Sequence, residues 1–154
     1  MPTITPCLWF DGKAEEAARF YTSLLPDSRI DKVHRAPSDY PAGKAGGVLT
    51  VEFTLLGQPF LGLNGGPLFK FNEAVSFQVH CETQQEIDHF WSELAKDGEE
   101  GPCGWLKDKF GLSWQIIPKA LPEMMKNENS DRVMRSMLQM RKIDIAALRR
   151  AQAA

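Results

Sequence analysis

Residues 103–118 read CGWLKDKFGLSWQIIP and predict a β-hairpin. Its arms are expected at 104–108 and 112–117, joined by a turn that contains Gly111. Pro118 has no backbone N–H, so pairing is expected to end there. Because side chains alternate along a strand, the second arm has an apolar face and a more polar one: Leu112, Trp114 and Ile116 share the first, and Ser113, Gln115 and Ile117 share the second. One face can pack on a core while the other lines a cup.

Length and composition indicate one ordinary domain, or two small half-domains that share a core. The chain has 154 residues, a formal net charge of -2 and three cysteines. This charge argues against a nucleic acid or an anionic membrane surface as the partner, and no segment approaches the ~20 apolar residues of a membrane span. The cysteines are odd in number and form no CxxC pair, which favours reduced thiols in the cytoplasm. Alternation predicts that Cys7 and Cys81 lie buried on apolar faces.

The order of predicted elements occurs twice. A strand at 3–10, a helix at 13–25 and strands at 28–36, 48–56 and 59–64 form the first set. A strand at 73–82, a helix at 83–96, a short strand at 99–103 and the hairpin form the second. A shift of 70 positions aligns the helices and pairs Glu16 with Glu86, Phe20 with Phe90, Tyr21 with Trp91, Thr22 with Ser92, and Leu24 with Leu94. The pattern predicts an α+β fold of two paired βαβββ modules, 1–67 and 73–118, whose sheets form a cup within one domain at 1–118.

Residues 119–154 differ from the modules and predict a helical extension. Helices are expected at 120–126, 131–140 and 143–151, and the sequence Asn129-Ser130-Asp131 offers an N-cap for the second. Methionines and Leu138 form an apolar stripe on that helix. The stripe predicts packing on the domain or on a second subunit, and hence a homodimer.

Several motifs resemble the vicinal oxygen chelate superfamily, which includes glyoxalase I and ring-cleaving dioxygenases. The resemblance is stronger to its PhnB-like group, which is often labelled 3-demethylubiquinone-9 3-methyltransferase. The motifs are TPCLWF at 5–10, AEEA at 14–17 with FY at 20–21, LNGGP at 63–67, FNEAVSF at 71–77, EID at 86–88 with FW at 90–91, the hairpin, and KIDI at 142–145. The resemblance also implies a dimer.

Metal-dependent members of that superfamily hold one divalent ion with His and Glu side chains from both modules. The resemblance places these ligand positions at Pro6, Ser76, Gln115 and within 60–64, where this chain has no good ligand. We therefore predict no metal at the usual site, although a displaced site using His80 and Glu52 stays open. No glycine-rich strand-to-helix turn of the kind that holds S-adenosylmethionine is found, so no cofactor is predicted.

The expected cup is polar but neutral. Its predicted ligand-binding residues are Asn64, Ser76, Gln78, Trp105, Lys107, Ser113 and Gln115. Aromatic surface with a few hydrogen-bonding groups suits a small aromatic or quinone-like molecule. The alternative is an enzyme that uses His80 or Glu52 as its base, with Gln78 and Gln115 donating to a developing oxyanion. Turnover lost in His80→Ala would favour the enzyme, whereas affinity that survives this change without any turnover would favour binding.

Overall fold

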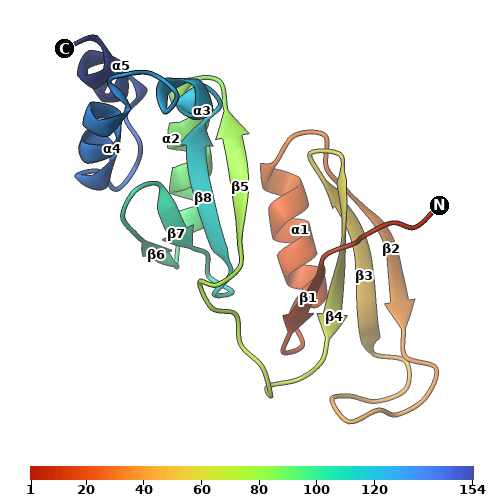
Figure 1. Ribbon diagram of the computed structural model, residues 1–154. Helices are drawn as coiled ribbons and strands as arrows, with labels where there is room; N and C mark the ends of the chain where they lie inside the picture. Colours follow the sequence, from red (N-terminus) through yellow and green to blue (C-terminus); the bar gives the residue numbers. More distant parts are fainter. The chain divides into compact units, whose positions relative to one another are not determined.

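The computed structural model describes residues 1–154, which divide into two compact units, 1–70 and 71–154. Each unit holds one four-stranded sheet with one helix packed on it, as Figure 1 shows. The second unit also contains the C-terminal helices, which are coloured blue there.

The first unit has the predicted βαβββ order. Its elements are β1 (Cys7–Phe10), α1 (Ala14–Leu24), β2 (Arg29–Arg35), β3 (Val48–Leu55) and β4 (Gln58–Asn64). The strand order is β1-β4-β3-β2, with β1 parallel to β4 and the other neighbours antiparallel. The helix buries one stripe, because Ala14, Ala17, Ala18 and Tyr21 recur at helical spacing and are inaccessible to solvent.

The second unit repeats this topology. Its sheet contains β5 (Ser76–Cys81), β6 (Glu99–Glu100), β7 (Trp105–Lys107) and β8 (Ser113–Pro118), in the order β5-β8-β7-β6. Its helix α2 (Gln84–Ala95) begins 70 residues after α1, as the sequence alignment of the two helices predicts. A capping box between Thr83 and Glu86 fixes that start. Two βαβββ modules are therefore confirmed.

The hairpin is formed by β7 and β8, with Leu106 opposite Trp114 and Lys107 opposite Ser113. The turn is organised by the buried Asp108 carboxylate. It accepts hydrogen bonds from the backbone N–H groups of Phe110 and Leu112 and from Trp114 Nε1, at 2.8, 3.0 and 2.9 Å. The second arm of the hairpin was expected to end at residue 117, which is one residue early. Strand β8 includes Pro118, opposite Cys81, and Lys119 N donates the next ladder bond to the Cys81 carbonyl at 2.7 Å.

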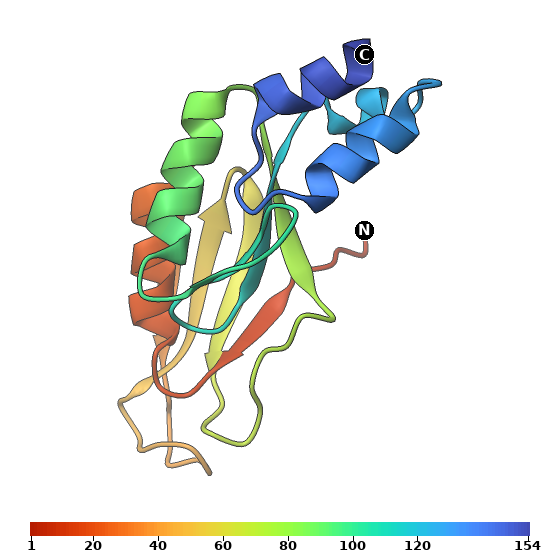
Figure 2. The ribbon, with the colours of Figure 1, turned by 90° about the vertical axis from the view of Figure 1, so that its left-hand side faces the viewer.

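The C-terminal extension packs on the second unit. It contains α3 (Leu121–Met124), α4 (Ser130–Leu138) and α5 (Ile145–Ala153), and the last two lie side by side in Figures 1 and 2. Cys103 N and Gly104 N donate to the carbonyls of Met140 and Arg141, both at 2.8 Å. The Gln84 amide continues this attachment, since it donates to the Ile143 carbonyl and accepts from Ile145 N.

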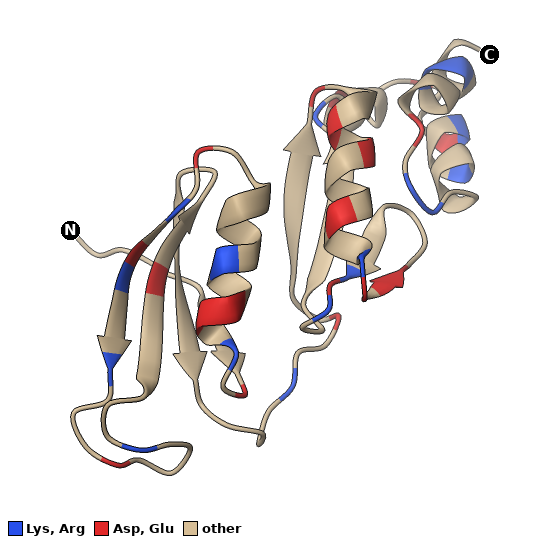
Figure 3. Cartoon of the chain, turned by 180° about the vertical axis from the view of Figure 1, so that it is seen from behind, with Lys and Arg blue, Asp and Glu red and all other residues tan.

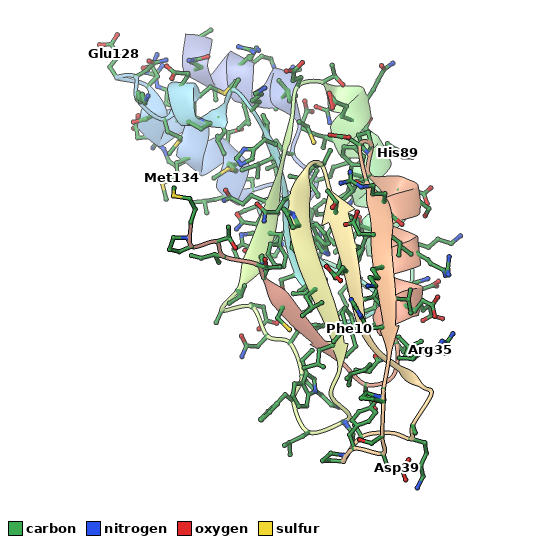
Figure 4. The ribbon with its side chains drawn as sticks, turned by 90° about the vertical axis from the view of Figure 1, so that its right-hand side faces the viewer. Phe10, Arg35, Asp39, His89, Glu128 and Met134 are labelled. Carbon is green, nitrogen blue, oxygen red and sulfur yellow. The ribbon has the colours of Figure 1, made fainter.

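The residue predicted to cap α4 makes a different hydrogen bond from the one expected. Asn129 occupies the cap position, but its side chain makes no capping hydrogen bond. Its amide donates instead to the Gln152 carbonyl at 2.6 Å, so it joins α4 to α5. Met134 points away from α4 into open space (Figure 4), and its exposed fraction is 47%. No helix in the structure combines the length and apolar character that crossing a membrane requires.

Candidate functional site

The sheet of the second unit carries the predicted polar face. Ser76, Gln78 and His80 alternate on β5 with buried Val79 and Cys81. The strand register brings further predicted residues onto the same face, because β5 pairs in parallel with β8, and β7 pairs with β8 on its other side. The facing pairs are Ser76 with Ser113, Gln78 with Gln115, Trp105 with Gln115, and Lys107 with Ser113. The sheet thus places all seven predicted site residues of this unit on one face, with His80 at the end away from Ser76.

Two glutamines and a serine on this face form a hydrogen-bonded row. Gln78 Nε2 donates to Gln115 Oε1 at 3.4 Å, and Gln115 Nε2 donates to Ser76 Oγ at 2.9 Å. His80 lies at the other end of β5, opposite Ile117, and is exposed. The row carries no charge. Within it, Gln115 has one amide hydrogen that is not yet bonded, and Ser76 has its hydroxyl hydrogen, so both can donate to a ligand.

A pocket of about 460 Å³ opens beside this row. Trp105, Lys107 and Ser113 line it from the hairpin, and its other lining residues are Glu73, Glu99, Glu100, Gly101, Pro102 and Leu106. Ser113 is 0% exposed, and its Oγ is a buried polar side-chain atom that has no hydrogen-bond partner. An unsatisfied buried hydroxyl costs about 1–3 kcal/mol, and native proteins seldom keep one without a reason.

Two of the residues that line this pocket form an ion pair. Lys107 Nζ contacts the Glu73 carboxylate, which belongs to the segment just before β5. A hydrogen bond from Lys107 lowers the pKa of the Glu73 carboxyl, and the same bond raises the pKa of the Lys107 ammonium. Both groups are therefore charged at neutral pH, and Lys107 already has an anionic partner.

The two predicted site residues of the first unit lie in different surroundings. Glu52 is exposed on β3, where its carboxylate contacts His34 Nε2 from β2. Both residues line a separate pocket of about 360 Å³. His34 is not among the residues that the sequence predicts for the site. In the register of β2 with β3, Lys32 lies opposite Glu52 and His34 lies opposite Thr50, so the imidazole reaches Glu52 diagonally.

Asn64 is buried, and both ends of its amide are used inside the first unit. Its Oδ1 accepts from Ala14 N at 2.9 Å, at the start of α1, and its Nδ2 donates to the Val48 carbonyl at 2.9 Å. The side chain joins α1 to β3. Its predicted contact with a ligand stays a prediction.

The prediction for Cys7 is wrong. Cys7 is exposed, whereas Leu8 and Phe10 are buried, so β1 turns its odd-numbered residues away from the core. Cys81 is buried as predicted, and burial raises the pKa of its thiol to about 12. The shift of 70 fits the helices but not the first strands. In β5 the even-numbered Ser76 lies on the polar face, so its counterpart by face is Thr5 or Cys7 rather than Pro6.

This correction leaves the metal ligands of the superfamily without suitable counterparts. By face, the counterpart of Ser76 is the hydroxyl of Thr5 or the thiol of Cys7, and a single thiol does not make a ligand set. Gln115 is already bonded to Ser76. No group of three or more His, Cys, Asp or Glu side chains is arranged to hold a metal ion. The residues present do not fit the usual divalent ion of this fold.

The comparisons with known proteins agree with this architecture. The family model for 3-demethylubiquinone-9 3-methyltransferase matches residues 2–117. The chain belongs to this family. Within it, the PhnB protein from Bacillus cereus shares 41% identity and has a TM-score of 0.67, with 76% of this chain and 99% of that chain covered. No curated protein matches.

More distant structures share the fold of this PhnB-like protein. A protein from Pseudomonas aeruginosa has a TM-score of 0.65 at 16% identity, over 77% of this chain and 98% of that chain. The fosfomycin resistance protein FosX from Listeria monocytogenes, in complex with Mn(II) and sulfate, has a TM-score of 0.55 at 13% identity, over 81% and 95%. These matches show that the chain shares their fold.

Proposed function

We propose that this PhnB-like protein binds a small aromatic or quinone-like molecule, without a metal, in the pocket beside β7 and β8. The observation that carries the proposal is the buried Ser113 hydroxyl, which lacks a partner and belongs to a residue lining that pocket. A ligand oxygen would satisfy it. The face of Trp105 and the stem of Lys107 supply apolar contact, which is the usual combination in small-molecule sites.

A calorimetric titration with 1-naphthol tests this proposal. The probe combines a flat aromatic ring with one hydroxyl, so it can contact Trp105 and hydrogen-bond Ser113 together. We expect binding by the wild type and at least a roughly tenfold weaker affinity in Ser113→Ala, because one lost buried hydrogen bond corresponds to about 1.4 kcal/mol or more. Ser38→Ala, in an exposed loop, is the matched control and should bind as the wild type does. Absence of binding, or equal affinity in both variants, would contradict the proposal.

The family's methyltransferase description finds little support in the two βα turns of this chain. The turn before α1 contains one glycine, Gly12, and the turn before α2 contains none. Both helix starts are also bonded internally, α1 through Asn64 and α2 through Thr83 and Glu86. A nucleotide-like cofactor normally binds at a turn with several glycines, where the backbone N–H groups at the start of the helix are free to donate to it. Binding of S-adenosylmethionine therefore forms no part of this proposal.

We further propose that the protein is a homodimer in the cytoplasm. Met125, Met134 and Leu138 expose apolar side chains on the C-terminal helices, and a second copy would cover them. The three free thiols suit a reducing compartment. Light scattering at micromolar concentration should give twice the chain mass of 17.3 kDa. A mass equal to one chain would count against the dimer.

A further inference from the structure

The pocket beside β7 and β8 is lined by more negative than positive charge. Glu73, Glu99 and Glu100 line it, and Lys107 is the only cationic residue among its lining residues. Two of these carboxylates make up the whole of β6, the edge strand drawn in red in Figure 3. The Glu100 carboxylate is bonded to Trp91 of α2, so the pocket face has two negative charges, Glu73 and Glu99, against the one positive charge of Lys107.

The positive charge of Lys107 is already balanced within the protein. Its ammonium contacts Glu73, and Glu99 lies directly opposite it in the β6–β7 register. An anionic ligand would have to replace Glu73 as the partner of Lys107. It would also be repelled by the negative charge on β6. Binding a negative charge here is thus opposed by both contacts.

The two carboxylates of β6 are less well compensated. Glu99 is exposed and has no ion pair within 4 Å, and the cation opposite it in the register, Lys107, is bound to Glu73. Glu100 accepts a hydrogen bond from the neutral indole of Trp91, and Arg141 donates to its backbone carbonyl at 3.1 Å. At least one negative charge on the pocket wall is left for a ligand to neutralise.

An aromatic wall lies next to these carboxylates. Trp105 belongs to β7, the strand that pairs with β6, and it lines the same pocket. A tryptophan face attracts a cation by about 0.5–2 kcal/mol, more than tyrosine or phenylalanine does. Carboxylates and an indole on one pocket wall are the groups that recognise protonated or quaternary amines.

We propose that the natural ligand of this pocket is a positively charged aromatic amine. This inference rests on the proposed binding function and specifies the class of molecule bound. The buried Ser113 hydroxyl forms one hydrogen bond with a polar substituent on the ring of the ligand. The charged nitrogen of the ligand lies between Trp105 and Glu99. The charge on the ligand is then the feature that separates it from neutral phenols and quinones of similar size.

Two probes of nearly equal shape isolate the contribution of charge. Phenyltrimethylammonium and tert-butylbenzene differ by one nitrogen in place of carbon, so an affinity difference reports on charge alone. We expect calorimetry to give at least tenfold tighter binding of the cation at low ionic strength. We expect this preference to fall in 1 M NaCl, because the charges are exposed and salt screens them.

Variants locate the effect in the pocket. Glu99→Gln should weaken binding of phenyltrimethylammonium about three- to fivefold and leave tert-butylbenzene unchanged. Glu93→Gln, on the exposed surface of α2, is the matched control for the same change in net charge. A melting curve for each variant shows that folding is intact.

The outcomes separate this inference from the proposed function. Equal affinity for the two probes, or binding of 1-naphthol without binding of the cation, would keep the pocket and overturn the charge preference. Cation binding that is equally strong in Glu99→Gln would also overturn it. No binding of any of the three compounds would overturn both proposals. A cation preference that depends on Glu99 supports both.

Discussion

Asp108→Ala should lower the free energy of unfolding by about 4 kcal/mol, equivalent to a fall in melting temperature of about 12 °C. The Asp108 carboxylate is 3% exposed and accepts from two backbone N–H groups in the hairpin turn and from the Trp114 indole. Removing it takes the acceptor away from two buried donors, Leu112 N and Trp114 Nε1, and from one partly buried donor, Phe110 N. The loss is large because each buried donor without a partner costs its full desolvation energy.

The matched control is Asp131→Ala, which removes a carboxylate from an exposed pair with Arg135 on α4. That pair is worth at most about 0.5 kcal/mol. Asp108→Asn should fall between the two, since an amide keeps one acceptor oxygen. Thermal unfolding followed by circular dichroism measures all three. If Asp108→Ala melted within 3 °C of Asp131→Ala, the turn would not depend on this carboxylate as described.

Gly98→Ala should be the next most damaging change, at about 3 kcal/mol. A Cβ built at Gly98 would lie 2.2 Å from the Lys107 carbonyl oxygen and 2.8 Å from the Asp108 carbonyl carbon. Both neighbours are backbone atoms, so a side-chain rotation cannot relieve the clash. The β6 and β7 strands must separate, which also displaces Glu99 and Lys107 at the pocket. We therefore expect weaker binding of 1-naphthol together with the loss of stability.

Gly47→Ala is the control for the general cost of replacing glycine. Its Cβ would meet one atom, the Lys44 carbonyl oxygen, at 3.2 Å. We expect a change below about 1 kcal/mol there, with the free energies of unfolding of both variants measured by denaturant titration. Equal destabilisation by the two variants would show that close packing of β6 on β7 is not what requires a glycine at 98.

Much of the fold could be predicted because local patterns and tertiary packing agree. The hairpin follows from alternation around Gly111, and the buried stripe of α2, with Ile87, Phe90, Trp91 and Leu94, follows from helical spacing. The duplicated order of elements indicated the same topology for both sheets. Such signals repeat along several residues, so an error at one position changes little.

The errors arose where one residue decides the outcome. A shift of one position reverses the faces of a short strand, and this is how Cys7 was assigned to the core. Asn129 has the right residue type for a cap, but a carbonyl of α5 competes for its amide. The contact between His34 and Glu52 depends on how β2 pairs with β3, and the register of that pairing cannot be deduced from the sequence. Nor could alternation predict that Ser113 would be buried without a partner.

Melting curves of the wild type and Ser113→Ala, each with and without saturating 1-naphthol, test the binding proposal most directly. Without the compound, Ser113→Ala should melt about 3 °C above the wild type, because it removes an unsatisfied buried hydroxyl worth about 1 kcal/mol. With the compound, the order should reverse, since the wild type forms the extra hydrogen bond, binds more tightly and so gains more linked stabilisation than the variant. A wild type that is more stable without the compound, or no reversal in its presence, would contradict a ligand role for the Ser113 hydroxyl.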